Sequence, residues 1–300
     1  MPATHISRRA RRGLAAAMAA GTVLAALATA TPAGASTGGA TVGGATVGGS
    51  HVTCTSQQPG LAARLSQDIA DALRGRQGAS ALALYDRSTA TSCTFRADAA
   101  FDSASVVKVT VLGALLRQAA EEHRALTARE VKLTTAMITK SDNASTNALW
   151  HQIGTAGVQH FLTLAGMRDT VPGADNHWGR TQVTAGDQLK LLRLLTSDNE
   201  VLDRSARAYA LGLMNRVVPE QRWGTPAGVP ATTTVHVKNG WLPDETDGWR
   251  VNSVGVFTGE GRDYEMAVLS RGSRTMADGV ATVQAAARAI NRDLNRSTAA

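Results

Sequence analysis

The chain has 300 residues, of which 43% are hydrophobic and 18% charged, a balance that is typical of a globular protein and excludes a disordered or collagen-like one. Its formal net charge of +7 includes four arginines within residues 1–12, and setting residues 1–35 aside leaves +3. This removes most of the support for a nucleic-acid partner, and we expect none.

The first 35 residues have the three-part layout of a secretory signal peptide. A basic stretch precedes an apolar, alanine-rich run over residues 13–30, and an A-x-A cleavage site ends at Ala35. The Arg8-Arg9 pair resembles a twin-arginine export signal, but Ala10 and the following Arg11-Arg12 depart from that pattern, so the export route stays open. An uncleaved membrane anchor is the alternative, but the cleavage site argues for removal. We therefore expect a secreted or cell-wall-associated protein without stable membrane insertion after processing.

Residues 36–58 consist mainly of small residues, and the pentapeptide GGATV occurs twice in succession. This composition predicts a flexible Gly-rich linker before a folded domain over residues 59–300. The only two cysteines, Cys54 and Cys93, both follow the signal peptide. An oxidising compartment favours a disulfide between them over two buried free thiols.

The remaining chain is predicted as a helix at residues 60–74, strands at 80–85 and 91–95, helices within 106–215, strands at 232–240, 251–258 and 264–270, and a final amphipathic helix at 276–294. Two isolated strands would be unstable, so the strands from both ends must share one sheet. The sequence therefore predicts an α/β fold. Its five-stranded antiparallel sheet would be flanked by the terminal helices, with an all-helical insertion at about residues 109–225.

Lysine is rare in this chain, with five residues against 26 arginines. Arginine stays protonated whereas a desolvated lysine can lose its proton, so a retained lysine indicates chemistry. Lys108 lies three residues after Ser105, on the same face at the start of an apolar helix. A neutral lysine there can accept the serine proton, while the helix N-terminus favours an oxyanion. The alternative is a helix-capping serine beside a surface lysine.

Three motifs in order resemble those of class A β-lactamases and penicillin-binding proteins. Residues 105–108 match S-x-x-K, residues 141–143 are Ser-Asp-Asn, and residues 238–240 read Lys-Asn-Gly where the family has Lys-Thr-Gly. A second Ser-Asp-Asn at residues 197–199 follows a different helix, and we choose the first copy because the family pattern places it there. The resemblance spans about residues 60–295 and implies a β-lactamase/transpeptidase-like fold.

The resemblance implies catalytic roles for three side chains. Ser105 would be the acylated nucleophile, Lys108 its general base, and Ser141 the relay that passes a proton to the leaving nitrogen. The backbone N–H groups of Ser105 and Trp241 would form the oxyanion hole.

The resemblance also implies a substrate-binding set. Asn143 would hydrogen-bond the substrate side-chain amide, and Lys238 would bind the substrate carboxylate and help to position the relay serine. Asn239 and Gly240 complete the third motif, and the Asn239 amide would donate to the same carboxylate. Arg250 would add a second positive charge there, unless it is an ordinary exposed arginine.

The chain departs from the family pattern in its third motif, in a short stretch of 36 residues between Ser105 and Ser141, and in its deacylation machinery. Class A enzymes use a loop glutamate to activate the deacylating water, but residues 131–199 contain no glutamate. Asp175 and His177 are the candidate bases in the corresponding loop, and each also fits a solvated surface residue. We therefore expect slow or unusual deacylation.

The leading interpretation is an exported serine hydrolase of class A β-lactamase type that acts on β-lactams or related amides, and we expect it to be a monomer. The first alternative is a cell-wall DD-peptidase or transpeptidase with a peptidoglycan-derived substrate, which the missing glutamate favours. The second alternative is a protein that binds β-lactams or wall fragments without turnover. We expect no cofactor and no metal, because the histidines show no ligand spacing.

Overall fold

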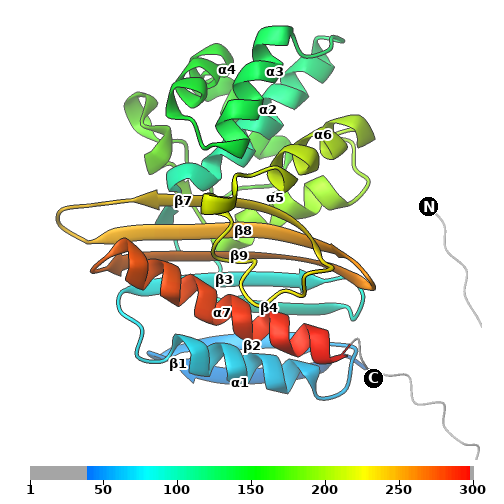
Figure 1. The fold of residues 1–300 in the computed structure, drawn as a ribbon, viewed down its shortest axis with the longest axis vertical. Coiled ribbons are helices and arrows are strands. Elements are labelled where there is room, and N and C mark those ends of the chain that lie inside the picture. Colours follow the sequence, from blue (N-terminus) through cyan, green and yellow to red (C-terminus); the bar gives the residue numbers. More distant parts are fainter. Residues whose placement is uncertain (1–38, 298–300) are drawn as a thin grey trace, which may run out of the picture. The chain divides into compact units, whose positions relative to one another are not determined.

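The central sheet consists of seven strands, and every neighbouring pair is antiparallel. The computed structural model describes residues 39–297, so the predicted signal peptide lies outside the described part. The strands are β1 (Thr41–Val47), β2 (Ser50–Ser56), β3 (Ala79–Asp86), β4 (Thr91–Phe95), β7 (Thr234–Leu242), β8 (Trp249–Gly259) and β9 (Arg262–Ser273). Their spatial order is β1-β2-β4-β3-β9-β8-β7, which leaves β1 and β7 at the two edges (Figure 1).

Helices lie on both faces of this sheet. On one face, α1 (Leu61–Leu73) and α7 (Met276–Ser297) lie side by side (Figure 1). On the other face, α5 (Ala185–Thr196) packs against β3, β8 and β9. The remaining helices form a helical subdomain beside β7, made of α2 (Val107–Glu121), α3 (Ala128–Thr139), α4 (Asn143–Leu164) and α6 (Arg204–Asn215). The predicted fold class is therefore confirmed.

The central strands are buried on both faces because each face is covered by helices. Val254 and Val256 of β8 and Met266 and Val268 of β9 are all fully buried. Neighbouring positions between them are buried as well, which is the pattern expected for a strand between two layers.

The linker predicted at residues 36–58 is wrong over residues 41–56, which form a β-hairpin of β1 and β2. Gly48 and Gly49 make its two-residue turn with φ of 52° and 75°, a left-handed conformation that glycine adopts readily. Val52 and Cys54 are fully buried, and a disulfide joins Cys54 to Cys93 of β4. These two strands raise the sheet from the predicted five strands to seven.

The small residues of β1 serve helix packing. A Cβ atom at Gly43 would lie 2.3 Å from the carbonyl oxygen of Ala62 in α1, so the helix rests directly on the strand backbone. The small residues that led to the prediction of a linker therefore allow α1 to pack closely against β1.

A small second sheet positions the loop that the sequence analysis singled out. It pairs β5 (Phe101–Asp102) with β6 (Gln182–Val183). In the chain, β5 directly precedes the 3₁₀ turn Ala104–Val106, and β6 directly follows the 3₁₀ turn Trp178–Arg180. Ser103 N donates to Thr181 O at 2.9 Å, and Ser103 Oγ donates to Trp178 O at 3.3 Å. The loop before β6 is therefore held against the segment that enters α2.

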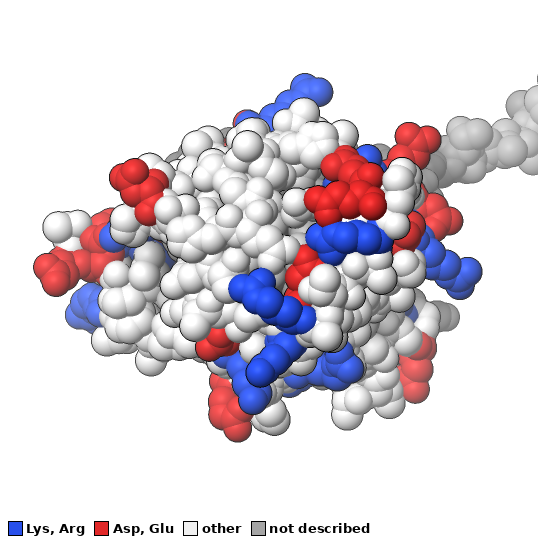
Figure 2. Space-filling model, turned by 90° about the horizontal axis from the view of Figure 1, so that it is seen from above, with Lys and Arg blue, Asp and Glu red and all other residues white. Residues whose placement is uncertain are grey.

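Figure 2 views the molecule from above, from the side of the helical subdomain. Positive and negative side chains both occur on this face, around a broad area that carries neither. Neither sign dominates the face. Within residues 39–297, no helix combines the length and apolar character needed to cross a membrane.

Candidate active site

Ser105 lies in the short 3₁₀ turn that leads into α2, with its side chain half-buried. The preceding Ala104 has φ 45°, a conformation that residues with a Cβ atom rarely adopt. Val106 and Val107 on the following side are fully buried and anchor the turn to the core. The hydroxyl is thus carried on a fixed turn at the N-terminal end of a buried helix.

Lys108 is fully buried in the first turn of α2. Its Nζ lies 2.7 Å from Ser141 O, 3.0 Å from Ser141 Oγ and 2.7 Å from Asn143 Oδ1. Burial lowers the pKa of this amine to about 7, while the Asp142 carboxylate acts in the opposite direction. Because this pKa is close to neutral, about half of the Lys108 amines are uncharged at pH 7, and the uncharged amine has a lone pair that can accept a proton.

Ser141 lies between α3 and α4 with φ 58°, and its hydroxyl lies between two amines. Lys238 Nζ donates to Ser141 Oγ at 3.0 Å, the same distance as Lys108 on the other side. Asp142 caps α4 by accepting from Ser145 N at 2.6 Å. The turn that presents the hydroxyl is therefore fixed by the start of the helix.

The second Ser-Asp-Asn copy has a different environment. Asn199 Nδ2 donates to Leu194 O at 2.8 Å, and Asn199 Oδ1 accepts from the backbone N–H groups of Val201 and Leu202. These bonds close the turn after α5. This geometry accounts for the second copy as a structural turn.

The third motif lies on the edge strand β7, directly against the serine turn. Lys238 is fully buried. Burial is the larger cause, and the nearby Lys108 charge the smaller one, that holds the pKa of Lys238 well below its usual range. A Cβ atom at Gly240 would lie 2.5 Å from Ser105 N and 2.8 Å from Val106 N. Only glycine lets the strand approach this closely, which brings the strand backbone to the nucleophile.

Asn239 does not face a substrate, contrary to the expectation. It is fully buried, and its Nδ2 donates to Gln221 O at 2.8 Å and to Trp223 O at 2.7 Å. Both amide protons are used in these bonds, so the side chain ties β7 to the loop that precedes it. The ring of Trp223 in turn packs 5.9 Å from that of Trp241, between ring centroids.

Arg250 is not an ordinary exposed arginine, because only 8% of its surface is exposed. Its Nε pairs with Asp102 Oδ2 at 3.0 Å, and its Nη2 lies 3.4 Å from Oδ2 of both Asp244 and Asp247. Three carboxylates therefore surround the guanidinium, an environment that does not favour binding a further carboxylate.

A cleft of about 360 Å³ opens beside Ser105. Among the described residues that line it, none is an aspartate or a glutamate. His177 lines the cleft, whereas Asp175 is exposed and is absent from its lining. The lining residues are Ala104, Ser105, Asn143, Asn147, Asn176, His177, Trp178, Gly179, Arg180, Trp241 and Leu242.

Three of these lining residues, Asn147, Trp178 and Arg180, were missed in the sequence analysis. The ring centroid of Trp178 lies 4.8 Å from Lys108 Nζ, and its indole N–H donates to Asn147 Oδ1 at 2.7 Å. Trp178 and Arg180 lie in the loop that drew attention to Asp175 and His177. The available signal was that loop's short length, since a short loop brings most of its side chains near its anchors.

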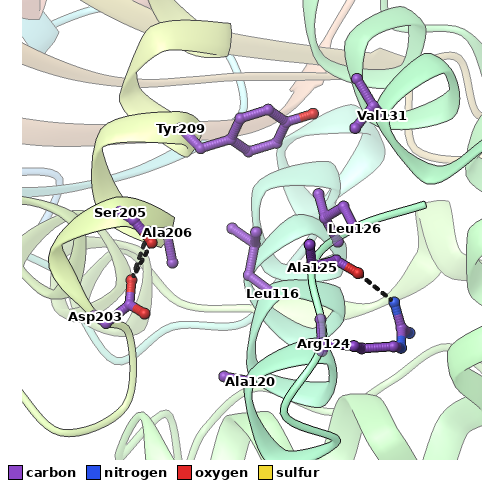
Figure 3. A pocket seen from close by; sticks show the side chains of 11 residues that line it. Leu116, Ala120, Arg124, Ala125, Leu126, Val131, Asp203, Ser205, Ala206 and Tyr209 are labelled. Carbon is purple, nitrogen blue, oxygen red and sulfur yellow. Dashed lines mark hydrogen bonds between the residues drawn. The ribbon is translucent and has the colours of Figure 1, made fainter. Parts of the chain in front are cut away.

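A second cavity, of about 400 Å³, lies between α2, α3 and α6 (Figure 3). Apolar side chains such as Leu116 line much of it. Its polar groups have partners in the protein, since the Tyr209 hydroxyl is 2.6 Å from Thr134 Oγ1 and Ser205 Oγ donates to Asp203 at 2.7 Å. The cavity contains none of the three motifs, so the candidate active site is the cleft at Ser105.

Comparison with known proteins agrees with this geometry. The sequence matches the Beta-lactamase enzyme family over residues 64–134 and 130–294. It is 27% identical over 216 residues to the protein named "Putative lipoprotein LppW" in Mycobacterium tuberculosis and Mycobacterium bovis, covering 70% of this chain and 68% of the relative.

Solved structures share the fold at low sequence identity. A class A β-lactamase from Bacteroides cellulosilyticus matches with a TM-score of 0.68 and 17% identity, covering 78% of this chain and 98% of that one. A β-lactamase from Xanthomonas campestris pv. campestris matches with a TM-score of 0.66 and 20% identity, with the same coverage of both chains.

Proposed function

Because the chain belongs to the Beta-lactamase enzyme family, we propose that it is an exported serine hydrolase that is acylated at Ser105 by a β-lactam or a related amide and deacylates slowly. The observation that carries this proposal is the amine of Lys108. It is fully buried, has a pKa of about 7, contacts the Ser141 hydroxyl at 3.0 Å, and belongs to a residue three positions after Ser105 at the start of α2.

In the proposed acylation, neutral Lys108 accepts the hydroxyl proton of Ser105 while the serine oxygen bonds to the amide carbonyl carbon. The carbon–nitrogen bond then breaks as Ser141 donates its proton to the leaving nitrogen. Ser141 recovers a proton from the protonated Lys108, whose Nζ lies 3.0 Å from its hydroxyl. The net result is one new ester bond, one broken amide bond, and the transfer of the Ser105 proton to nitrogen.

The backbone N–H groups of Ser105 and Trp241 would stabilise the negative oxygen of the tetrahedral intermediate. The close approach of Gly240 to Ser105 N supports this assignment, because it brings β7 and the serine turn together. Lys238 would act mainly on Ser141, whose hydroxyl its amine contacts at 3.0 Å. Asn143 remains the proposed contact for a substrate amide, since it lines the cleft.

Deacylation requires a base that activates water on the acyl ester. Among the described lining residues, His177 carries the only imidazole and none carries a carboxylate, which makes His177 the remaining candidate base. A cleft wall without carboxylates supports an acyl-enzyme that persists. The same observation favours the second candidate function, a DD-peptidase or transpeptidase that passes its acyl group to a different acceptor.

Export is supported by two independent observations. The disulfide between Cys54 and Cys93 is a bond that persists in oxidising compartments. The name of the mycobacterial relative, a lipoprotein, is also in line with a location outside the cytoplasm.

The proposal is tested by incubating the mature protein with benzylpenicillin and following intact mass over time. Ser105→Ala removes the proposed nucleophile and should abolish the adduct. The two Ser-Asp-Asn copies provide a matched pair, because Ser141→Ala should slow acylation strongly whereas Ser197→Ala should leave it unchanged. Release of D-alanine from a peptide ending in D-Ala-D-Ala is measured in parallel.

A long-lived adduct on the wild type and on Ser197→Ala, but not on Ser105→Ala, is the expected result. Rapid hydrolysis of penicillin without a lasting adduct would refute slow deacylation and lead to tests of His177. Release of D-alanine would favour the peptidase function. If no adduct forms and neither substrate gives a product, both catalytic functions are excluded and a binding protein is favoured.

A further inference from the structure

The cleft beside Ser105 has one side chain with a permanent positive charge. Among its described lining residues, only Arg180 carries a guanidinium, and about 52% of that side chain is exposed. The lysines of the motifs lie beneath the surface, where Lys108 and Lys238 are both fully buried. Because arginine stays protonated at any physiological pH, Arg180 presents a constant positive charge to the cleft.

The backbone of Arg180 is held in a defined place relative to the nucleophile. Its N–H donates to His177 O at 2.8 Å within the 3₁₀ turn Trp178–Arg180. The carbonyl oxygen of the next residue, Thr181, accepts a hydrogen bond from Ser103 N at 2.9 Å. Ser103 lies two residues before Ser105. The guanidinium therefore extends from a backbone that is tied to the serine turn.

The groups expected to receive a substrate anion are committed elsewhere. Lys238 donates to Ser141 Oγ at 3.0 Å and to Asn239 O at 2.7 Å. The Asn239 amide is used on the preceding loop, and Arg250 is surrounded by three carboxylates. Arg180 is the described cleft residue that remains accessible to an incoming anion.

Arg180 already has anionic partners, and their arrangement allows exchange. Its Nη1 and Nη2 both lie 3.1 Å from Asp244 Oδ2, and Nη1 lies 3.4 Å from Asp102 Oδ2. The same two carboxylate oxygens also pair with the buried Arg250, so they keep a cationic partner if Arg180 moves. The two aspartate side chains are only 10% and 11% exposed, but about half of the Arg180 side chain is in contact with water, which screens its ion pairs and allows a substrate carboxylate to compete for it.

We propose that Arg180 is a specificity-determining residue that selects amide substrates carrying a carboxylate close to the scissile bond. This inference rests on the proposed function for its location at Ser105, but anion recognition itself requires no acylation. It can therefore be tested by binding alone, in a protein that lacks the nucleophile.

The test measures the dissociation constants of benzylpenicillin and its uncharged methyl ester for the Ser105→Ala variant. Binding is read from the fluorescence of the cleft tryptophans Trp178 and Trp241. The acid should bind more tightly than the ester. Adding Arg180→Gln should weaken binding of the acid roughly 10- to 100-fold, as expected for a charged hydrogen bond, and leave the ester within about twofold.

Arg180→Lys should recover part of the preference, because it keeps the charge without the forked donor geometry. Arg74→Gln is the control for net charge, since Arg74 lies after α1, is 62% exposed and is absent from the cleft lining. This control should leave the preference unchanged.

Asp244→Asn supplies a gain of affinity that misfolding cannot imitate. Asp244 uses Oδ1 to accept from Thr246 and Asp247 N in its turn, and uses Oδ2 for the arginines. Asparagine can keep the first set of bonds and replaces the second oxygen with a donor, which releases Arg180. Binding of the acid should then tighten several-fold.

Equal binding of acid and ester, or an equal loss of both in Arg180→Gln, would overturn the inference. So would an Asp244→Asn variant whose affinity for the acid does not rise. If the acid preference depends on Arg180 but the wild-type protein is never acylated at Ser105 in the mass assay, anion selection is supported while the proposed hydrolase is refuted.

Discussion

The acylation rate should follow the protonation state of Lys108. The protonated amine cannot accept the Ser105 proton, so the rate must fall as pH decreases through the pKa of about 7. The neutral fraction is roughly 9% at pH 6 and roughly 91% at pH 8, so the rate should rise about tenfold between them and level off above. A lysine with its ordinary pKa of 10.5 would still gain about tenfold from pH 8 to pH 9.

The assay is the second-order rate constant for appearance of the penicillin adduct, measured by intact mass between pH 5 and pH 9. Lys108→Arg keeps the charge but cannot be neutral, and should lower this constant by about 10²- to 10⁴-fold at every pH. His177 is the other candidate base that lines the cleft, so His177→Asn is the control and should keep the profile. A profile without a midpoint between pH 6 and pH 8, or one that disappears in His177→Asn, would refute the reasoning.

Three further substitutions test the surroundings of the site. Asp142→Asn removes the carboxylate that raises the pKa of Lys108, so the midpoint of the acylation profile should move to lower pH. Gly240→Ala places a Cβ atom 2.5 Å from Ser105 N, and the displaced turn should lower acylation on the order of 10²-fold in the same assay. Asn239→Thr removes the amide that bonds two buried carbonyls and should lower the free energy of unfolding by roughly 1–3 kcal/mol, measured by denaturant titration.

Each of these expectations has a clear contrary result. A midpoint that stays in place or rises in Asp142→Asn would show that its charge does not act on the lysine. Wild-type acylation in Gly240→Ala would mean that the strand and the serine turn do not touch in solution. Unchanged stability in Asn239→Thr would mean that the loop carbonyls find other partners without cost.

The motif residues could be predicted because each motif is a local pattern in a recognisable element. Ser105 and Lys108 follow helical spacing, and Ser141 directly precedes Asp142, the N-cap residue of α4. Their meeting with Lys238 follows once the order of the motifs is read with the family fold. The capping box at Thr127 and Glu130 is likewise a local pattern, since all its partners lie within one helical turn.

The predictions failed where a residue depends on a distant partner. Arg250 is neutralised by Asp102, which lies 148 positions earlier in the chain. Asn239 is turned away from the cleft by carbonyls 16 and 18 positions upstream. No local pattern contains these pairings. The hairpin at residues 41–56 was missed for a different reason, because glycine and alanine conceal the alternation that predicts a strand.

The contact between Gly43 and α1 divides the GGATV repeat into constrained and unconstrained positions. Gly43 has no room for a side chain, whereas the nearest atom to a Cβ at Gly44 would be 4.0 Å away and nothing lies within 4 Å of one at Gly39. Substitution at Gly43 should therefore be purged during evolution, while Gly39 is free to drift. We then expect related chains to keep a glycine at the position of Gly43 without keeping the whole GGATV pentapeptide. The sequence repeat would be lost in such chains although the β-strand is retained.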